Sequence, residues 1–111
     1  MTLRMCVLLW EQPGRDKDLA EFEDAVLAMV PDYGGTVVSR ETVIERADGD
    51  PLEVQVLEMP DEQSVTAYLA DPRRGALPPR EEIIARTQTL RVAPVTSRRS
   101  GAPPDPAAAS A

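Results

Sequence analysis

Apolar residues recur along the chain with two different spacings, one typical of strands and one typical of helices. Short runs rich in Val, Leu, Ile and Thr predict strands over residues 3–10, 36–46, 52–59 and 87–95. Stretches with apolar residues three or four positions apart predict helices over residues 16–30 and 61–71. Pro-Gly, Gly-Gly and Asp-Gly pairs between these segments indicate turns.

The predicted order is strand, helix, strand, strand, helix, strand, with a hairpin at Asp48-Gly49. Short connections and right-handed crossovers fold this order into a four-stranded antiparallel sheet, with both helices on one face and strands one and three in the centre. The sequence therefore predicts an α+β, ferredoxin-like βαββαβ domain over residues 1–96. A further short helix is predicted over 80–86, and a disordered tail rich in Pro, Ala and Ser over 97–111.

The first predicted strand is apolar on both faces, although the two helices can cover only one. Its alternating sets of side chains are Cys6, Leu8 and Trp10 on one face, and Met5, Val7 and Leu9 on the other. Monomers rarely leave an apolar patch of that size in water. We therefore expect the open sheet face to meet a second copy of the chain, which gives a homodimer.

The chain has a formal net charge of −7, and its only dense basic spots are short. Nucleic-acid binding normally requires a basic face, so we expect no nucleic-acid partner. No apolar run reaches the roughly 18 residues of a membrane span, so we expect no membrane partner. Cys6 is the single cysteine, which rules out an intrachain disulfide, and no signal-peptide pattern opens the chain. We expect a cytoplasmic protein.

Histidine is absent from the sequence, which excludes Ser-His-Asp and Cys-His catalysis and every histidine ligand to haem or metal. We expect no cofactor and no transition metal, while a carboxylate-bound magnesium ion stays open. Helical spacing places the acidic residues of the first helix around its solvent side rather than in a metal cluster. These residues are Asp16, Asp18, Glu21, Glu23 and Asp24.

Several local motifs resemble those of a known protein family. They are Tyr33-Gly34-Gly35, Arg40, Glu58-Met59-Pro60-Asp61, Tyr68 with Asp71-Pro72, and Arg80. Together they resemble a small, poorly characterised family of the dimeric α/β-barrel superfamily, in which two ferredoxin-like sheets pack face to face, although that family usually has Phe where Met59 stands. The superfamily includes cofactor-free monooxygenases, aromatic polyketide cyclases, lactone isomerases, haem-handling enzymes and amino-acid-sensing regulators. The resemblance therefore implies a fold and a dimer, but no single reaction.

Arg40 and Glu58 are the predicted catalytic residues. Arg40 shares a strand face with Val38 and Thr42, where its guanidinium could hold a carboxylate or an enolate. Glu58 shares a face with apolar residues such as Val56, which would raise its pKa and let it move a proton. The alternatives are an interfacial salt bridge for Arg40, and a solvated or Arg40-paired carboxylate for Glu58.

Trp10, Tyr33 and Tyr68 are the predicted substrate-binding residues. Trp10 ends the first strand, a usual place for the mouth of a cavity, and could stack on a planar ligand. The two tyrosines could donate hydrogen bonds to a ligand. The alternatives are a core or dimer-interface role for Trp10, and packing at helix ends for Tyr33 and Tyr68.

The strand that is apolar on both faces and the resemblance to the superfamily together favour a small-molecule-binding dimeric barrel. The resemblance implies that it acts on an apolar or aromatic, polyketide-like metabolite as a cofactor-independent cyclase, isomerase or monooxygenase. The alternative is a non-catalytic interaction or structural module whose second sheet face is only a dimer interface. A cavity of a few hundred cubic ångströms would favour the first interpretation, and a filled interior the second.

Overall fold

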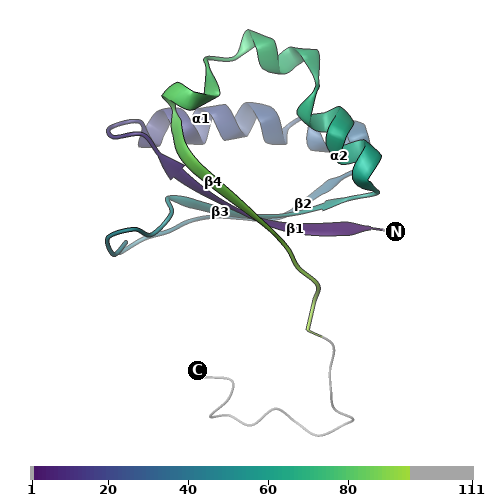
Figure 1. Cartoon of the computed structure of the whole chain (residues 1–111), viewed down its shortest axis with the longest axis horizontal. Coiled ribbons are helices and arrows are strands. Elements are labelled where there is room, and N and C mark those ends of the chain that lie inside the picture. The colour runs from purple at the N-terminus through teal and green to yellow at the C-terminus, as the bar shows by residue number, and fades with distance from the viewer. Residues whose placement is uncertain (1, 96–111) are drawn as a thin grey trace, which may run out of the picture.

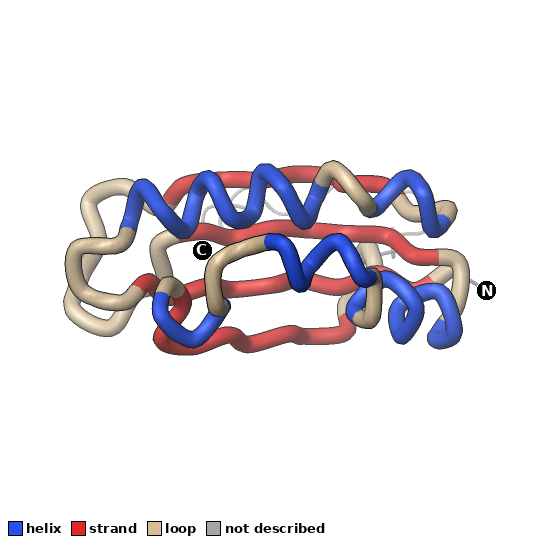
Figure 2. The backbone as a smooth tube through the Cα atoms, turned by 90° about the horizontal axis from the view of Figure 1, so that it is seen from above, coloured by secondary structure: helices blue, strands red, loops and turns tan. Residues whose placement is uncertain are grey.

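One antiparallel sheet with two helices on one of its faces forms the fold (Figures 1 and 2). The computed structural model describes residues 2–95, and the predicted tail over 97–111 lies outside the described residues. The main elements are β1 (Leu3–Glu11), α1 (Asp16–Leu27), β2 (Thr36–Thr42), β3 (Glu53–Met59), α2 (Glu62–Leu69) and β4 (Ile84–Arg91). The strand order β2-β3-β1-β4 puts β1 and β3 in the centre, so the predicted ferredoxin-like arrangement is confirmed.

The hydrophobic core lies between the sheet and α1. Met5 and Leu9 of β1 are buried on this side, next to Leu57 of β3. Leu19 and Val26 of α1 cover them at helical spacing and are themselves 0% and 3% exposed. The core therefore uses one alternate set of side chains from each central strand.

A short 3-10 turn (Val30–Tyr33) and two glycines connect α1 to β2. Gly34 has a φ of +77°, a left-handed conformation that glycine adopts without strain. At Gly35 a Cβ would lie only 2.4 Å from Met59 Sδ, so the backbone at this position can approach β3 only without a side chain. The predicted glycine turn into the second strand is confirmed.

β2 ends before the predicted residue 46 and contains a bulge. Its register against β3 shifts between Val37 and Ser39. The extra residue, Val38, lets Val37 and Arg40 share the helix-facing side although they are three positions apart. The prediction that Arg40 shares a face with Val38 is wrong for this reason.

β4 starts at Ile84 and not at residue 87, and the predicted helix over 80–86 reduces to a 3-10 turn (Arg80–Glu82). Ile83 and Ile84 are 2% and 4% exposed. An extended chain lets Ile84 pair with β1 while both isoleucines enter the core. Burial of this apolar pair outweighs the helical tendency of the preceding glutamates.

α2 begins after Asp61, one of the two predicted starts. The Asp61 carboxylate accepts a hydrogen bond from the backbone nitrogen of Ser64 at 2.7 Å, which caps the helix. After α2 the chain passes through a second 3-10 turn (Pro72–Ala76) and arches over the helix side of the sheet before it enters β4 (Figure 1). Within residues 2–95 no helix has both the length and the apolar character to cross a membrane.

Candidate functional site

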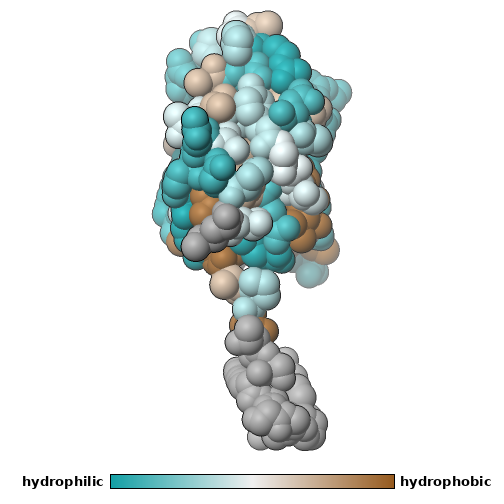
Figure 3. Space-filling view, turned by 90° about the vertical axis from the view of Figure 1, so that its right-hand side faces the viewer, coloured by the Kyte–Doolittle hydropathy of each residue, from teal (hydrophilic) through white to brown (hydrophobic). Residues whose placement is uncertain are grey.

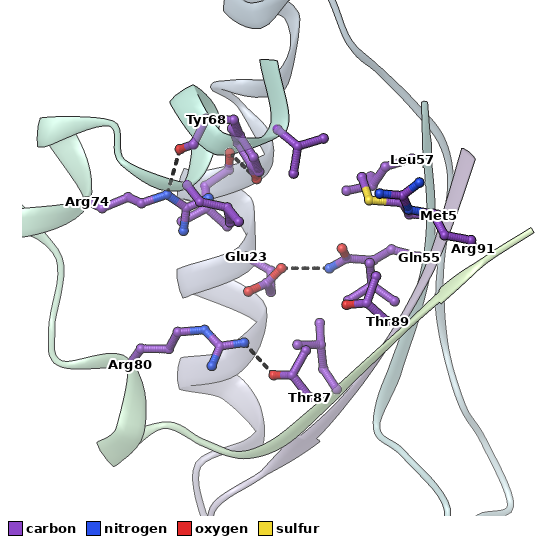
Figure 4. Close-up of a pocket in the computed structure, with 15 residues that line it drawn as sticks. Met5, Glu23, Gln55, Leu57, Tyr68, Arg74, Arg80, Thr87, Thr89 and Arg91 are labelled. Atoms are coloured by element: carbon purple, nitrogen blue, oxygen red, sulfur yellow. Dashed lines mark hydrogen bonds between the residues drawn. The ribbon is translucent and has the colours of Figure 1, made fainter. Parts of the chain in front are cut away.

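A cavity of about 360 Å³ lies between the sheet and the helices. β1 and β3 form its floor, α1 and α2 contribute its walls, and β4 and the 70–83 segment contribute its rim (Figure 4). This volume lies in the range of about 300–1,000 Å³ that is typical of small-molecule sites. Much of the lining is apolar and comes from Met5, Val7, Leu9, Val26, Leu57 and Val65.

Glu23 of α1 points into this cavity and is only 5% exposed (Figure 4). The prediction that Glu23 lies on the solvent side of α1 is wrong. The sequence did contain the signal, because Glu23 follows Leu19 by four positions and precedes Val26 by three, and so belongs to the buried stripe. Burial raises the pKa of the Glu23 carboxyl group, against the opposing influence of a hydrogen bond from Gln55.

Gln55 of β3 connects Glu23 to a second buried carboxylate. Its side-chain nitrogen donates to Glu23 Oε1 and to Glu53 Oε2, each at 2.7 Å. Glu53 also accepts hydrogen bonds from Arg40, at 2.8 Å from Nε and 3.2 Å from Nη2. A hydrogen-bonded chain therefore runs from Arg40 on the edge strand, through Glu53 and Gln55, to the carboxyl group in the cavity.

Arg40 lies outside the cavity lining, and its guanidinium is occupied by protein groups. Besides Glu53, it donates from Nη1 to Asp24 Oδ1 at 2.5 Å and from Nη2 to the carbonyl oxygen of Ala20 at 2.9 Å. These contacts fasten β2 to α1. The catalytic role of Arg40 as an anchor for a substrate anion stays a prediction, and these contacts do not favour it.

Glu58 lies on the opposite face of the sheet from Arg40. β3 alternates, so Gln55 points toward the helices while Glu58 points away and accepts a hydrogen bond from Arg4 Nη1 at 2.7 Å. The alternative that Glu58 pairs with Arg40 is therefore wrong, because its partner is Arg4. The role of Glu58 as a proton-transfer group stays a prediction.

Tyr68 is the predicted substrate-binding residue that the structure brings to the cavity. It is 6% exposed, and its hydroxyl donates to the carbonyl oxygen of Val26 at 3.0 Å, so its ring is the part available to a ligand. Tyr33 packs edge-on against Tyr68, with ring centres 6.0 Å apart. The Tyr33 hydroxyl donates to Asp71 Oδ2 at 2.5 Å, and this contact raises the pKa of Tyr33. Tyr33 therefore supports the cavity wall from behind.

Trp10 lies on the open face of the sheet, away from the cavity. Its register partner on β4 is Arg86, whose guanidinium carbon lies 4.3 Å from the centre of the Trp10 ring. The indole nitrogen donates to the carbonyl oxygen of Gly49 at 2.8 Å. Stacking of a cavity ligand on Trp10 therefore has no support in this geometry.

Three arginines, Arg74, Arg80 and Arg91, stand at the rim of the cavity. Arg74 Nε donates to the carbonyl oxygen of Tyr68 at 3.0 Å, and its guanidinium carbon lies 4.5 Å from the Tyr68 ring centre. Arg80 donates to the hydroxyl of Thr87, and Arg91 pairs with a glutamate of α2. The sequence identified only Arg80, and only as part of a motif. The period-two alternation of β4 places Thr87 and Arg91 on one face, and this was the sequence signal for Arg91.

The open face of the sheet carries a connected apolar patch. Cys6 lies opposite Val56 on one side and Leu90 on the other, and Leu8 lies opposite Val54. All five side chains are partly or largely exposed. Figure 3 shows hydrophobic surface gathered toward the lower, sheet side of the described residues, whereas the helix side above is mostly hydrophilic.

No protein-family model matches the chain, and no curated protein matches it. Several solved structures, in contrast, are similar to it. A NIPSNAP-like domain protein from Burkholderia xenovorans is 14% identical with a TM-score of 0.66, and the match covers 95% of this chain and 91% of that one. A protein of unknown function from Rhodopseudomonas palustris is 17% identical with a TM-score of 0.62, over 86% and 83% of the two chains.

A DABB-family protein with a ferredoxin-like fold from Mesorhizobium loti is 14% identical with a TM-score of 0.61, over 86% of this chain and 98% of that one. At such identities the likeness shows the fold alone. The chain is thus structurally similar to NIPSNAP-like and DABB-family proteins and shares their ferredoxin-like fold, which confirms the predicted resemblance at that level.

Proposed function

We propose that the chain binds a small, largely apolar organic molecule in the cavity between the sheet and the helices. The carrying observation is the combination of an apolar lining with one buried carboxyl group, Glu23, that points into the space. Burial raises the pKa of Glu23, and buried acids with raised pKa values cluster at functional sites. Burying a carboxyl group costs stability, so such a group is retained mainly where function uses it. An ordinary core would place an apolar side chain at this position.

Within this proposal Glu23 transfers a proton on the bound molecule without a cofactor. In its ionised form it removes a proton from a carbon beside a carbonyl group, and the resulting carboxylic acid returns that proton to another atom of the ligand. Atoms and electrons balance, and the outcome is an isomerisation or, where the carbanion attacks a second carbonyl, a cyclisation. Oxygenation of an aromatic ligand would start with the same proton removal but would also consume dioxygen as a co-substrate.

The test is native mass spectrometry of freshly purified protein. We expect a bound small mass in the wild type and in Val38→Trp, which enlarges an exposed residue of the bulge. Val65→Trp should lose the mass, because the indole would fill the cavity. Retention of the ligand by Val65→Trp would place the binding site elsewhere on the molecule.

Proton transfer is tested separately with the ligand thus identified. In D2O, wild-type protein should exchange a carbon-bound hydrogen of the ligand for deuterium, and Glu23→Gln should bind the ligand without exchange. Exchange at the wild-type rate by Glu23→Gln would contradict the role of Glu23.

We also propose that the open sheet face packs against a second copy of the chain. The apolar patch around Cys6, Leu8 and Val56 is flanked by the Arg4–Glu58 ion pair, an apolar centre with a charged rim as in protein interfaces. Leu8→Asp should raise the dimer dissociation constant by at least about a hundredfold, because two carboxylates would be buried across the interface. Ile44→Asp, on the exposed loop after β2, is the control. Sedimentation analysis that finds a monomeric wild type would contradict this packing.

The same apolar face supports the second candidate, a non-catalytic interaction module. In that case the cavity would have no physiological ligand, and the open face alone would carry the function. A dimer that carries no ligand, with no effect of Val65→Trp on any binding measurement, would favour this alternative.

A further inference from the structure

Two of the three arginines at the cavity rim form no ion pair with any carboxylate of residues 2–95, although Arg80 interacts at longer range with the single carboxyl group of the lining, Glu23. Within residues 2–95, the arginines that form no ion pair are Arg74, Arg80 and Arg86. Arg86 stacks on Trp10 on the open face, so the two others both stand at the cavity. This placement is unusual in a chain with a net charge of −7, where carboxylates are plentiful.

The contacts that position these two arginines leave much of each guanidinium free. Arg74 uses Nε toward the backbone of Tyr68 and lies over its ring, while Arg80 uses one terminal nitrogen toward Thr87 (Figure 4). A guanidinium carries five N–H donors in a planar fork that matches a carboxylate. Both side chains are therefore held in place by neutral groups and keep donors for an anion.

The position of these arginines also suits the entrance. A second hollow, of about 530 Å³, lies under the arch of residues 70–83 and shares Leu69, Arg74 and Arg80 with the cavity. The two arginines thus stand where the hollows meet, while the apolar lining around Leu57 lies deeper. An elongated apolar body would extend inward from this junction, and a charged head would remain beside the guanidinium groups.

We infer that the ligand of this cavity is an apolar molecule with a carboxylate head group, which Arg80 and Arg74 hold at the entrance. The inference rests on the proposed small-molecule function and names the class of molecule that the site selects. Glu23 does not outweigh the two arginines, because the cavity lining sets two guanidinium groups without ion pairs against this one carboxyl group. The head group at the rim also fixes which carbon of the ligand lies beside Glu23.

The experiment compares two probes that share one apolar body, 2-naphthoate and 2-naphthylmethanol, by isothermal titration calorimetry. We expect the wild type to bind the carboxylate at least about tenfold more tightly than the alcohol, because a charge-assisted hydrogen bond outweighs a neutral one. Arg80→Gln should remove this preference by weakening only naphthoate, and Arg74→Gln should reduce it. Amide chemical-shift changes at Thr87 and Thr89 would place the probe in the cavity.

Arg86→Gln is the matched control, since it removes the third arginine without an ion pair from the opposite face of the sheet. It should leave both affinities unchanged. Equal affinity of the wild type for the two probes, or an unchanged preference in Arg80→Gln, would overturn the head-group inference while the cavity remains a binding site. Binding of neither probe would overturn the small-molecule function itself. Circular dichroism of each variant confirms that the fold is intact.

Discussion

The helix-covered face of β3 is unexpectedly polar near its start, and its open face is unexpectedly apolar there. Toward the helices β3 presents Glu53 and Gln55, both buried, whereas away from them it presents Val54 and Val56. An antiparallel sheet with one solvated side ordinarily shows the reverse, with apolar residues inside and polar residues outside. This distribution of polar and apolar side chains is what we expect if the covered face includes the proposed binding site and the open face forms the proposed contact with a second copy.

The largest expected difference is in the free energy of unfolding when Leu8 or Leu9 is truncated. These neighbours occupy opposite faces of β1. Leu9→Ala should lower the free energy of unfolding by about 2–5 kcal/mol at every protein concentration, because Leu9 is 1% exposed in the core. Leu8→Ala should cost less than about 1.5 kcal/mol in dilute solution, and more as concentration favours pairing of the open faces. Urea denaturation at several protein concentrations measures both variants.

Equal, concentration-independent losses in the two variants would contradict the distinction between a closed and an open face. A larger loss in Leu8→Ala at the lowest concentration would show that the open face is already covered within one chain.

The next effect tests the polar chain on the covered face. Gln55→Leu removes the amide between Glu23 and Glu53, and should cost about 1–3 kcal/mol because each of these buried carboxyl groups loses one donor, although Glu53 keeps Arg40. Gln88→Leu is the matched change on the open side of β4, and should alter stability by less than about 0.5 kcal/mol. Thermal unfolding at neutral pH compares the two. An equally small loss of stability in Gln55→Leu and Gln88→Leu would mean that the hydrogen bonds of Gln55 do not stabilise the fold.

The pH dependence of stability tests Glu23 alone. In the unfolded chain its pKa is ordinary, near about 4.3, and in the folded state burial raises it. Between these two pKa values the folded state holds a proton that the unfolded state has lost. The free energy of unfolding should therefore fall as pH rises through this window, by at most about 1.4 kcal/mol per pH unit.

Glu23→Gln cannot ionise, so its stability profile should be flatter across the same window, and the two proteins should converge in shape below the unfolded pKa. Urea titrations between about pH 4 and pH 8 measure this difference. Parallel profiles would contradict a raised pKa in the cavity.

The smallest effect concerns the end of the open face. Arg86→Gln removes the cation over Trp10 and should cost about 0.5–1 kcal/mol. Trp10 is the only tryptophan, so its fluorescence emission reports on this face alone. The emission should shift in Arg86→Gln and stay constant in Arg74→Gln, where the cation lies over Tyr68. A shift of the Trp10 emission in both variants would mean that a change on the covered face alters the surroundings of Trp10 on the open face.

The fold was predictable because its signals are local and repeated. The apolar run in 3–10, the Gly34-Gly35 turn and the capped start after Asp61 each agree with the global arrangement. The start of β4 was missed because Glu81 and Glu82 favour a helix locally, whereas burial of Ile83 and Ile84 depends on tertiary contacts. Sequence alone contains no measure of such contacts.

The candidate site was harder to predict, because its composition depends on which face of the sheet or helix each side chain occupies. One bulged residue in β2 moves Arg40 relative to its neighbours, and no sequence pattern marks that bulge. The apolar run around Glu58 suggested a buried pocket, but it belongs to the uncovered side. Glu23 was classified by its charge and not by its place in the apolar stripe of α1, although its spacing from Leu19 was visible.

The bulge in β2 also limits how copies of this chain can assemble. β2 forms one edge of the sheet, and an uninterrupted edge could pair with another strand and grow without end toward a fibril. The register shift at Val38, followed by Arg40 and Glu41, breaks the regular row of backbone donors and acceptors that such growth needs. Association through the flat face has a natural end, because two faces that cover one another leave none free. The irregular β2 edge thus opposes open-ended strand addition on its side of the sheet and leaves the flat face as the surface for the proposed dimer.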